Sequence, residues 1–279
     1  MNEWNKTRIA EILIEAGRIA LRYYDAPQRS IKDDGSIVTN ADREIEQFFQ
    51  ECFDRPEHNV YMIGEETESE KSADYVSRAL AQTMYIVDPI DGTVPYACHV
   101  PVWGISIGLA VGGVIREGAI YLPITRELFV SDGDVVLRAV VAPAADSAAE
   151  FMTVERPETA RTDDGLIAVT QDITKIGGIG VPNPVQALAC AVMPLSYLLL
   201  GRYMAYVGNL KLWDLAGGLP LLHKLGIGAT FLCGKELSCR ISDDFYFLDE
   251  GRFDTWKIRN SCLFAAPPIA AALLPTIRT

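Results

Sequence analysis

The chain has 279 residues, of which 49% are hydrophobic, so it is long enough for one large domain or two closely packed ones and is not a small stapled module. Its formal charge of −12 and pI near 4.8 argue against a nucleic-acid partner, because binding a phosphate backbone needs clustered Lys and Arg. An acidic protein that acts on a phosphate also needs a local cation to offset the repulsion.

Cysteine usage and the N-terminus indicate the compartment. The six cysteines include no Cys-x-x-Cys pair, and only three histidines could complete a zinc site, so we expect buried free thiols in a reducing cytoplasm. The first residues are polar where a signal peptide would be apolar, and no apolar stretch reaches 18 residues. These features predict a soluble, cytoplasmic protein without a membrane span.

The first quarter of the chain predicts helices, a hairpin and a strand. Apolar residues at three- and four-residue spacing indicate the helices, and a polar turn centred on Asp34 and Gly35 indicates the hairpin. The expected elements are a helix over 3–25, a hairpin within 31–42, a helix over about 41–54 and a strand over 59–63. That strand ends at Glu65 and Glu66, a first pair of carboxylates at a strand end.

Residues 86–93, Ile-Val-Asp-Pro-Ile-Asp-Gly-Thr, are the most informative segment. An apolar run leads into Asp88, and Pro89 is expected to stop the strand there. Asp88 and Asp91 are suited to bind a hard cation such as Mg²⁺, and a helix start at Gly92 and Thr93 would offer free amides to a phosphate. The alternative is an ordinary Asp-Gly turn with a capping aspartate.

The rest of the chain predicts a largely antiparallel sheet followed by α/β units. The expected elements are a hairpin over 102–109 and 114–121, a strand at 128–130, a strand at 166–170, a helix over 184–201, a strand at 203–207 and a helix over 214–225. Residues 143–164 have few apolar anchors and predict a boundary between an N-terminal α+β sub-domain, 1–145, and a C-terminal α/β sub-domain, 146–279.

Carboxylates recur where predicted elements end. Asp42 follows the hairpin, Glu65 and Asp88 follow strands, and Asp214 opens a helix. Taken alone, Asp214 is better explained as a helix N-cap, which stabilises a helix without metal. Convergence of several such positions favours a metal site.

Four segments together resemble the inositol monophosphatase family of lithium-sensitive, Mg²⁺-dependent phosphatases, whose relatives include fructose-1,6-bisphosphatases and 3′-phosphoadenosine phosphatases. The matching segments, in the family's order and approximate spacing, are 32–42, 63–66, 86–93 and 213–217. The resemblance implies an αβαβα sandwich of mixed α+β and α/β character and a homodimer. It also implies about two or three Mg²⁺ ions per site, with Mn²⁺ as a substitute and Li⁺ as an inhibitor.

The resemblance also assigns roles. The implied metal ligands are Glu65, Asp88, the carbonyl of Ile90, Asp91 and Asp214. Glu65 and the Thr93 hydroxyl would orient and deprotonate the attacking water, with Asp42 completing the catalytic set by reaching a weaker metal through water. The Gly92 and Thr93 amides would hold the phosphate, and Asp91 would also contact the leaving-group hydroxyl. Lys32 either steers phosphate or only extends from the hairpin, and Glu66 is expected behind the ligands or in solvent.

The chain departs from the family pattern at positions that bind the leaving group in inositol-type members. Inositol-type members carry an acidic residue seven positions before the aspartate matched by Asp214, and Val207 stands there; residues 181–186 also differ. A separate departure is the Val94-Pro95 pair after the Gly92-Thr93 turn. We expect Pro95 to be tolerated in the first turn of a helix. Valine accepts no hydrogen bond from a polyol, so selectivity for inositol should weaken by on the order of one to three kcal/mol.

The sequence therefore predicts Mg²⁺-dependent hydrolysis of a small phosphate monoester, an inositol phosphate or a related sugar or polyol phosphate, with altered or broad specificity. Alternatives are 3′-phosphoadenosine or fructose-1,6-bisphosphate phosphatase activity, and a non-catalytic regulatory relative that acts as a binding protein. A nucleotide-binding or redox domain is disfavoured, since no Gly-x-Gly-x-x-Gly or Walker-type loop occurs.

Overall fold

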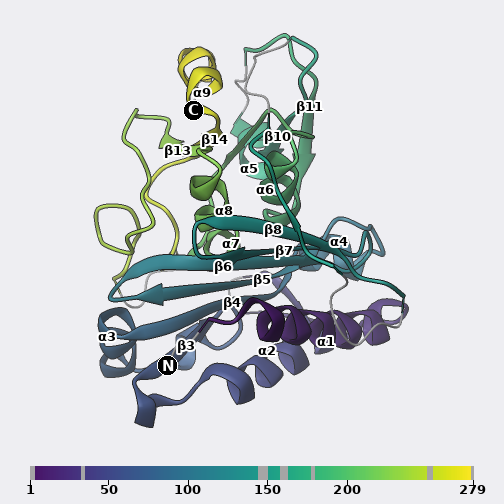
Figure 1. The fold of residues 1–279 in the computed structure, drawn as a ribbon, viewed down its shortest axis with the longest axis vertical. Helices are drawn as coiled ribbons and strands as arrows, with labels where there is room; N and C mark the ends of the chain where they lie inside the picture. Colours follow the sequence, from purple (N-terminus) through teal and green to yellow (C-terminus); the bar gives the residue numbers. More distant parts are fainter. Residues whose placement is uncertain are drawn as a thin grey trace.

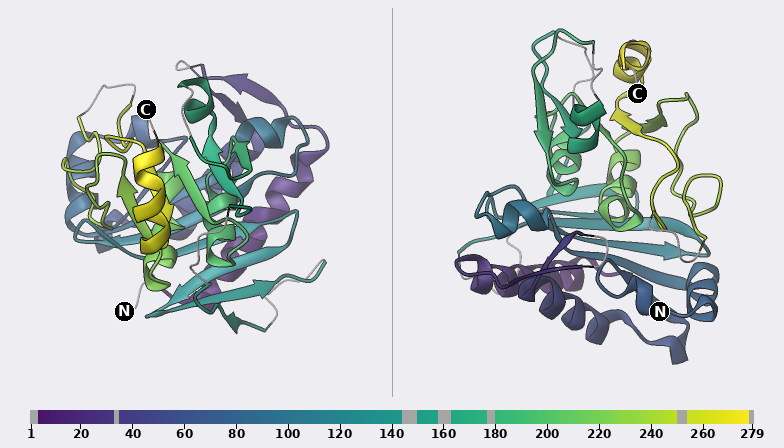
Figure 2. Two further views of the ribbon diagram at one scale, coloured as in Figure 1. Left: turned by 90° about the horizontal axis from the view of Figure 1, so that it is seen from above. Right: turned by 180° about the vertical axis from the view of Figure 1, so that it is seen from behind.

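Helices and two β-sheets alternate in five layers. The computed structural model describes residues 4–32, 35–143, 150–157, 163–176, 180–249 and 254–277. In Figure 1, helices α1 and α2 lie under a seven-stranded sheet, helices α6 to α8 lie above it, and a five-stranded sheet with α5 and α9 completes the stack. The view from behind in Figure 2 shows the same layering. The predicted αβαβα sandwich is confirmed.

The seven-stranded sheet supplies the floor of the site. Its order is β3-β4-β5-β6-β7-β8-β9; β3 and β4 pair in parallel, and the other neighbours pair antiparallel. The strands are β3 (Val60–Gly64), β4 (Thr83–Asp91), β5 (Gly104–Val111), β6 (Val114–Leu122), β7 (Glu127–Asp132), β8 (Val135–Val140) and β9 (Met152–Thr153). A separate antiparallel hairpin, β1 (Arg29–Ile31) and β2 (Ile37–Thr39), matches the predicted one, although Asp34 at its turn lies outside the described residues.

Local sequence fixes the two helices under this sheet. Helix α1 (Lys6–Tyr24) begins after Asn5, whose side chain accepts hydrogen bonds from the next turn's amides. Helix α2 (Asn40–Phe53) begins with a reciprocal capping box between Thr39 and Asp42. Both helices bury an apolar face against the sheet, as their periodicity predicts.

The five-stranded sheet is mixed. Its order is β11-β10-β12-β14-β13, with β10 parallel to both of its neighbours and β14 antiparallel to both of its own. The strands are β10 (Ile167–Thr170), β11 (Val185–Leu188), β12 (Ala205–Gly208), β13 (Gly228–Phe231) and β14 (Cys262–Ala265). Helices α5 (Gln171–Ile176) and α9 (Pro267–Leu273) cover its outer face.

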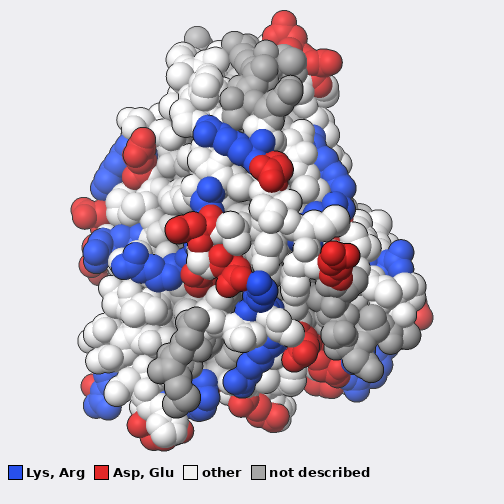
Figure 3. Space-filling model, in the orientation of Figure 1, with Lys and Arg blue, Asp and Glu red and all other residues white. Residues whose placement is uncertain are grey.

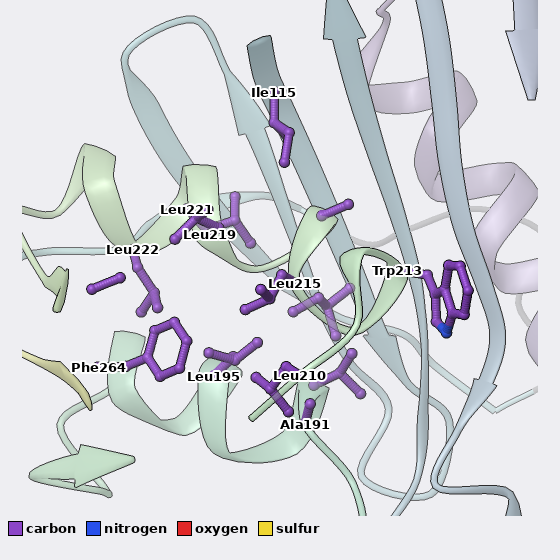
Figure 4. Packing of buried hydrophobic residues seen from close by; sticks show 14 of the residues in the cluster. Ile115, Ala191, Leu195, Leu210, Trp213, Leu215, Leu219, Leu221, Leu222 and Phe264 are labelled. Carbon is purple, nitrogen blue, oxygen red and sulfur yellow. The ribbon is translucent and has the colours of Figure 1, made fainter. Parts of the chain in front are cut away.

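The helices between the sheets form the central core. They are α6 (Val192–Leu199), α7 (Leu212–Ala216) and α8 (Leu219–Lys224). Figure 4 shows Leu195 of α6 and Leu222 of α8 beside Phe264 of the five-stranded sheet, and Leu215 of α7 belongs to the same buried cluster. Each buried leucine contributes about 1.5–3 kcal/mol of transfer free energy. The remaining short elements are α3 (Ala73–Ala81), α4 (Thr93–Ala97), η1 (Pro56–His58), η2 (Glu68–Glu70) and η3 (Leu274–Thr276).

The predicted helix over 184–201 is wrong in its first part. Residues 185–188 form β11, which pairs with β10, and the helix begins only at Val192. A continuous apolar run has no clear period, so periodicity alone does not separate a buried helix from a strand next to it. The backbone pairing available at the edge of β10 decides for the strand.

Two further boundaries differ from the prediction. Strand β4 does not stop at Pro89 but runs to Asp91, because an irregularity in its pairing with β5 between Asp88 and Asp91 accommodates the missing amide. The predicted helix over 214–225 is two short helices separated at Gly217 and Gly218. Because α7 begins at Leu212, Asp214 is the third residue of its first turn rather than the N-cap residue, which is Lys211.

The predicted boundary at 145 and 146 falls outside the described residues. All six cysteines are free thiols, but only Cys190 and Cys262 are buried; Cys52 and Cys239 are partly buried, and Cys98 and Cys233 are exposed. None of the described helices combines the length and apolarity that a membrane span requires. Figure 3 shows acidic and basic side chains interspersed on one face of the molecule.

Candidate metal and phosphate site

Asp88 is the centre of the candidate site. It lies near the end of β4, opposite Ser106 of β5, and is fully buried. Neither carboxylate oxygen has a hydrogen-bond partner among the described residues. Burial raises the pKa of Asp88 well above its ordinary value, and the nearby charges of Glu65 and Asp91 raise it further. A buried carboxylate without partners is costly, so this position calls for a cation.

Asp214 reaches Asp88 from the layer above because α7 packs unusually close to the sheet. A β-carbon built on Gly108 of β5 would lie 2.6 Å from the β-carbon of Ala216, and one built on Gly217 would lie 2.6 Å from the carbonyl oxygen of Ala119. Glycine is therefore required on both surfaces for this approach. The backbone amide of Lys211 donates to Asp214 Oδ2 at 2.8 Å, which fixes the carboxylate.

Asp91 is held by the start of α6. Its Oδ2 accepts hydrogen bonds from the amides of Ala191 at 2.6 Å and Val192 at 2.5 Å, and the Cys190 thiol donates to the same oxygen at 3.2 Å. Burial raises the pKa of Asp91 to about 6 although these donors lower it. Hydrogen bonds from a segment a hundred residues further along the chain therefore hold this carboxylate in place.

These three aspartates form one cluster. Asp88, Asp91 and Asp214 each offer an oxygen within 4.8 Å of the others. Burial raises the pKa of Asp214 well above its ordinary value, with Asp91 and Glu65 adding to the effect. Three carboxylates, one of them unpartnered, make an all-oxygen donor set that fits a hard divalent cation such as Mg²⁺.

The Gly92 turn separates this cluster from α4. Gly92 has φ 92°, a left-handed conformation, and a β-carbon there would lie 2.8 Å from the Val102 carbonyl. The Thr93 hydroxyl lies 3.1 Å from the Ile90 carbonyl oxygen and 3.3 Å from Asp42 Oδ1, and it is placed to donate to either. The turn thus connects the end of β4 to the start of α2.

Asp42 is buried at the start of α2. Its Oδ2 accepts hydrogen bonds from the Thr39 amide at 2.8 Å and the Thr39 hydroxyl at 2.5 Å. Burial raises the pKa of Asp42 to about 6, against these bonds. The capping box therefore holds this side chain against Thr93.

Glu65 lies beside the three-aspartate cluster rather than within it. Its Oε1 is 3.4 Å from Lys32 Nζ, and the same ammonium is 2.8 Å from Glu66 Oε2. Burial, followed by the charge of Glu65, raises the pKa of Glu66 to about 8. Lys32 thus bridges the two glutamates, and all three line a cavity of about 590 Å³.

Glu46 is a site residue that our sequence reasoning missed. It is buried on α2 and accepts hydrogen bonds from the Glu66 amide at 2.8 Å and the Thr67 hydroxyl at 2.6 Å. It therefore holds the loop that carries Glu65. The available signal was a glutamate next to Ile45 on the apolar face of a predicted helix.

Val207 does not face the cluster. It is fully buried in the core between the five-stranded sheet and α9, whereas Tyr206, its neighbour on β12, points to the other side of the sheet. A cavity of about 250 Å³ beside Asp91 and Asp214 is lined by Tyr206 and by residues 188–191, and its lining includes none of residues 181–186.

Comparisons with known proteins agree with this geometry. The model of the inositol monophosphatase family matches residues 2–253. The chain is 26% identical over 235 residues to an inositol-1-monophosphatase of Rhizobium meliloti (strain 1021), covering 80% of this chain and 83% of that one. It is likewise 26% identical over 231 residues to the Nus factor SuhB of Pasteurella multocida (strain Pm70), covering 76% and 79%.

The fold comparison extends over nearly the whole molecule. A solved IMPase structure from Thermotoga maritima superposes with a TM-score of 0.69 at 19% identity, covering 96% of this chain and 94% of that one. The layered architecture, the acidic cluster at the end of β4 and the family match together establish that the chain belongs to the inositol monophosphatase family.

Proposed function

We propose that this protein is a Mg²⁺-dependent hydrolase of small phosphate monoesters. The observation that carries the proposal is the fully buried Asp88, whose two oxygens lack partners beside the carboxylates of Asp91 and Asp214. Leaving such charges uncompensated destabilises the fold, so a binding-only protein gains nothing from keeping them together. Family membership supports phosphatase activity.

The proposed chemistry divides among the residues around this cluster. Asp88, Asp91 and Asp214 would hold the cation, with Glu65 and the Ile90 carbonyl completing its donors. When bound, Mg²⁺ supplies charge that offsets the phosphoryl oxygens and lowers the pKa of a nearby water. Glu65 would accept the proton of the attacking water, and the Thr93 hydroxyl, held between Ile90 and Asp42, would orient it.

The remaining roles follow the same arrangement. The Gly92 and Thr93 amides at the turn would bind phosphate oxygens, since glycine itself places no side chain between its backbone and a ligand. Asp42 would contribute to a further, weaker metal position. The ion pairs of Lys32 place its positive charge at the rim, where it offsets Glu65 and Glu66 until an anionic substrate arrives.

A regulatory, non-catalytic role is the second candidate, and the observation that favours it is the similarity to a protein named Nus factor SuhB. Phosphate release separates the two. With inositol 1-phosphate, fructose 1,6-bisphosphate and 3′-phosphoadenosine 5′-phosphate, we expect release that requires Mg²⁺ and stops with a chelator. No release from any of them at saturating Mg²⁺ or Mn²⁺ would contradict the enzymatic proposal.

We also propose a cytoplasmic homodimer. The six free thiols support a reducing compartment, and the assembly rests on the family resemblance alone. Light scattering coupled to gel filtration would test the assembly, and a mass matching one chain of 30.7 kDa would contradict it.

A further inference from the structure

Trp256 has an unusual backbone conformation for a buried residue. Its φ is 68°, in the left-handed region that bulky residues rarely adopt, and it is only 3% exposed. The other described non-glycine residues with positive φ, Asn59, His99 and Arg126, are all exposed. A strained conformation persists where the surrounding contacts over-determine it, so the contacts of Trp256 indicate its role.

The backbone of Trp256 is paired with the segment that leads into α7. The amide of Leu212, the first residue of α7, donates to the Trp256 carbonyl oxygen at 2.9 Å. Lys211 and Lys257 form an antiparallel bridge beside this bond. The Lys211 amide in turn donates to Asp214 Oδ2 at 2.8 Å. Trp256 therefore holds the backbone that fixes the Asp214 carboxylate.

The side chain of Trp256 reaches the loop that carries Glu65. The indole Nε1 donates to Glu68 Oε2 at 3.2 Å, between residues 188 positions apart in the chain. Glu68 begins η2, three residues after Glu65. Glu46 holds the same loop from α2, so the indole is a second anchor that comes from the C-terminal part of the chain.

The two segments that Trp256 contacts both line the cavity of about 590 Å³ at the site. Glu65 and Glu68 belong to one segment and Lys211 to the other. Trp256 itself belongs to the central buried cluster, so its ring is held by apolar packing. A rigid residue bonded to both segments limits how far they can move apart.

We propose that Trp256 is a positioning residue that sets the distance between Glu65 and Asp214. The inference rests on the proposed phosphatase function, in which both carboxylates are donors to the bound cation. Residues that orient metal ligands from behind influence metal affinity, because the ligands must be held close to one geometry. The segment matched by the family model ends at residue 253, and Trp256 lies beyond it.

Mg²⁺ binding to Trp256→Phe, measured by calorimetry, tests this role. The substitution removes the indole N–H and keeps an aromatic ring in the core. We expect the Kd for Mg²⁺ to rise about three- to tenfold, the effect of losing one hydrogen bond. A residue that only stabilises the fold would lower the unfolding free energy and leave the Kd of the folded protein unchanged.

Trp4→Phe is the matched control. Trp4 is also buried, and its indole Nε1 donates to the Ser131 carbonyl oxygen at 2.9 Å, between residues 127 positions apart. It lines neither of the two cavities at the site. Trp4→Phe should therefore lower stability and leave the Kd for Mg²⁺ within about twofold of wild type.

Variants of Glu68 test the same contact from its other end, and they serve if Trp256→Phe does not fold. Glu68→Ala should raise the Kd for Mg²⁺ by a similar factor, whereas Glu68→Gln keeps an acceptor oxygen and should restore most of the affinity. The double variant Trp256→Phe/Glu68→Ala should bind Mg²⁺ no more weakly than the weaker single variant, because both changes remove one interaction.

The outcomes separate this role from the proposed function. Wild-type affinity in both Trp256→Phe and Glu68→Ala would overturn the positioning role alone. Additive losses in the double variant would do the same, because the two residues would then act independently, and so would an equal loss in Trp4→Phe. Absence of Mg²⁺ binding in wild type would overturn the proposed function and the positioning role with it.

Discussion

Two groups of buried carboxylates in this molecule are balanced in opposite ways. Glu127 on β7 is nearly inaccessible, yet Arg202 binds both of its oxygens, at 3.0 and 2.9 Å, and Arg138 binds Oε1 at 2.6 Å. These guanidinium groups lower the pKa of Glu127 although burial opposes them. Asp88 and Asp214, by contrast, have raised pKa values and no guanidinium partner among the hydrogen bonds described above.

The contrast separates a structural acid from acids that await a ligand. At Glu127, a structural acid, two arginines of the same chain balance the buried negative charge. The lack of such balance at Asp88 indicates that charge balance is completed by something the chain binds. Variants of the two groups should accordingly fail in different ways.

The largest expected effect is the loss of catalysis when Asp88 is replaced. Asp88→Asn should lower kcat by about a thousandfold, equivalent to about 4 kcal/mol, because a neutral amide holds a divalent cation poorly. Its unfolding free energy without metal should not fall, since the variant removes an uncompensated buried charge. Steady-state phosphate release and urea unfolding with a chelator measure the two quantities; full activity, or a large loss of stability, would reverse the assignment.

Replacing Glu127, which is paired with two arginines, should lower stability and leave activity nearly unchanged. Glu127→Gln leaves Arg138 and Arg202 without their shared anion and should lower the unfolding free energy by about 1–3 kcal/mol. Activity per folded molecule should stay within about twofold, since Glu127 does not line either cavity described above. Urea unfolding beside active-site titration provides the comparison, and an unchanged midpoint would remove the structural role.

A pH series sharpens the role of Glu127. Because its pKa is lower in the folded than in the unfolded protein, its stabilising contribution is complete above the unfolded value and is lost as the pH falls through the folded value. The difference in unfolding free energy between wild type and Glu127→Gln should therefore be constant near neutral pH and shrink below about pH 4. A difference that grows on acidification would have the wrong sign for this account.

The smallest effect should come from an exposed carboxylate. Asp132 pairs with Lys6 at 2.5 Å, but both side chains are more than a third accessible. Asp132→Asn should lower stability by no more than about 1 kcal/mol, and less in high salt. Thermal unfolding at two salt concentrations checks this. A loss of unfolding free energy as large as that of Glu127→Gln would show that burial does not explain the difference between Asp132 and Glu127.

The positions of the cluster residues could be predicted, but not their partners. Asp88 follows from an apolar run that ends in a carboxylate, and Asp214 from a carboxylate that opens an apolar helix; adjacent residues carry both signals. The bonds from Ala191 and Val192 to Asp91 depend on contacts across a hundred residues, and no local pattern records them. Glu46 was missed although its place beside Ile45, on the apolar face of a predicted helix, is a local signal.

The residue expected to bind the leaving group shows a second limit of prediction from the sequence. Counting seven positions back from Asp214 selects Val207, but successive residues on a strand point to opposite faces, and the face toward the cavity belongs to Tyr206. A one-residue difference in the connection between β12 and α7 is enough to exchange the two. Counting along the sequence does not determine which face of the sheet a side chain occupies. The pairing of the strand within the sheet determines it.

Titration of Mg²⁺ into the protein by calorimetry tests the central claim most directly. The cluster of Asp88, Asp91 and Asp214 predicts saturable Mg²⁺ binding in wild type and in Glu127→Gln, and its loss in Asp88→Asn while that variant remains folded. Mg²⁺ binding of equal affinity in Asp88→Asn and wild type would contradict the account.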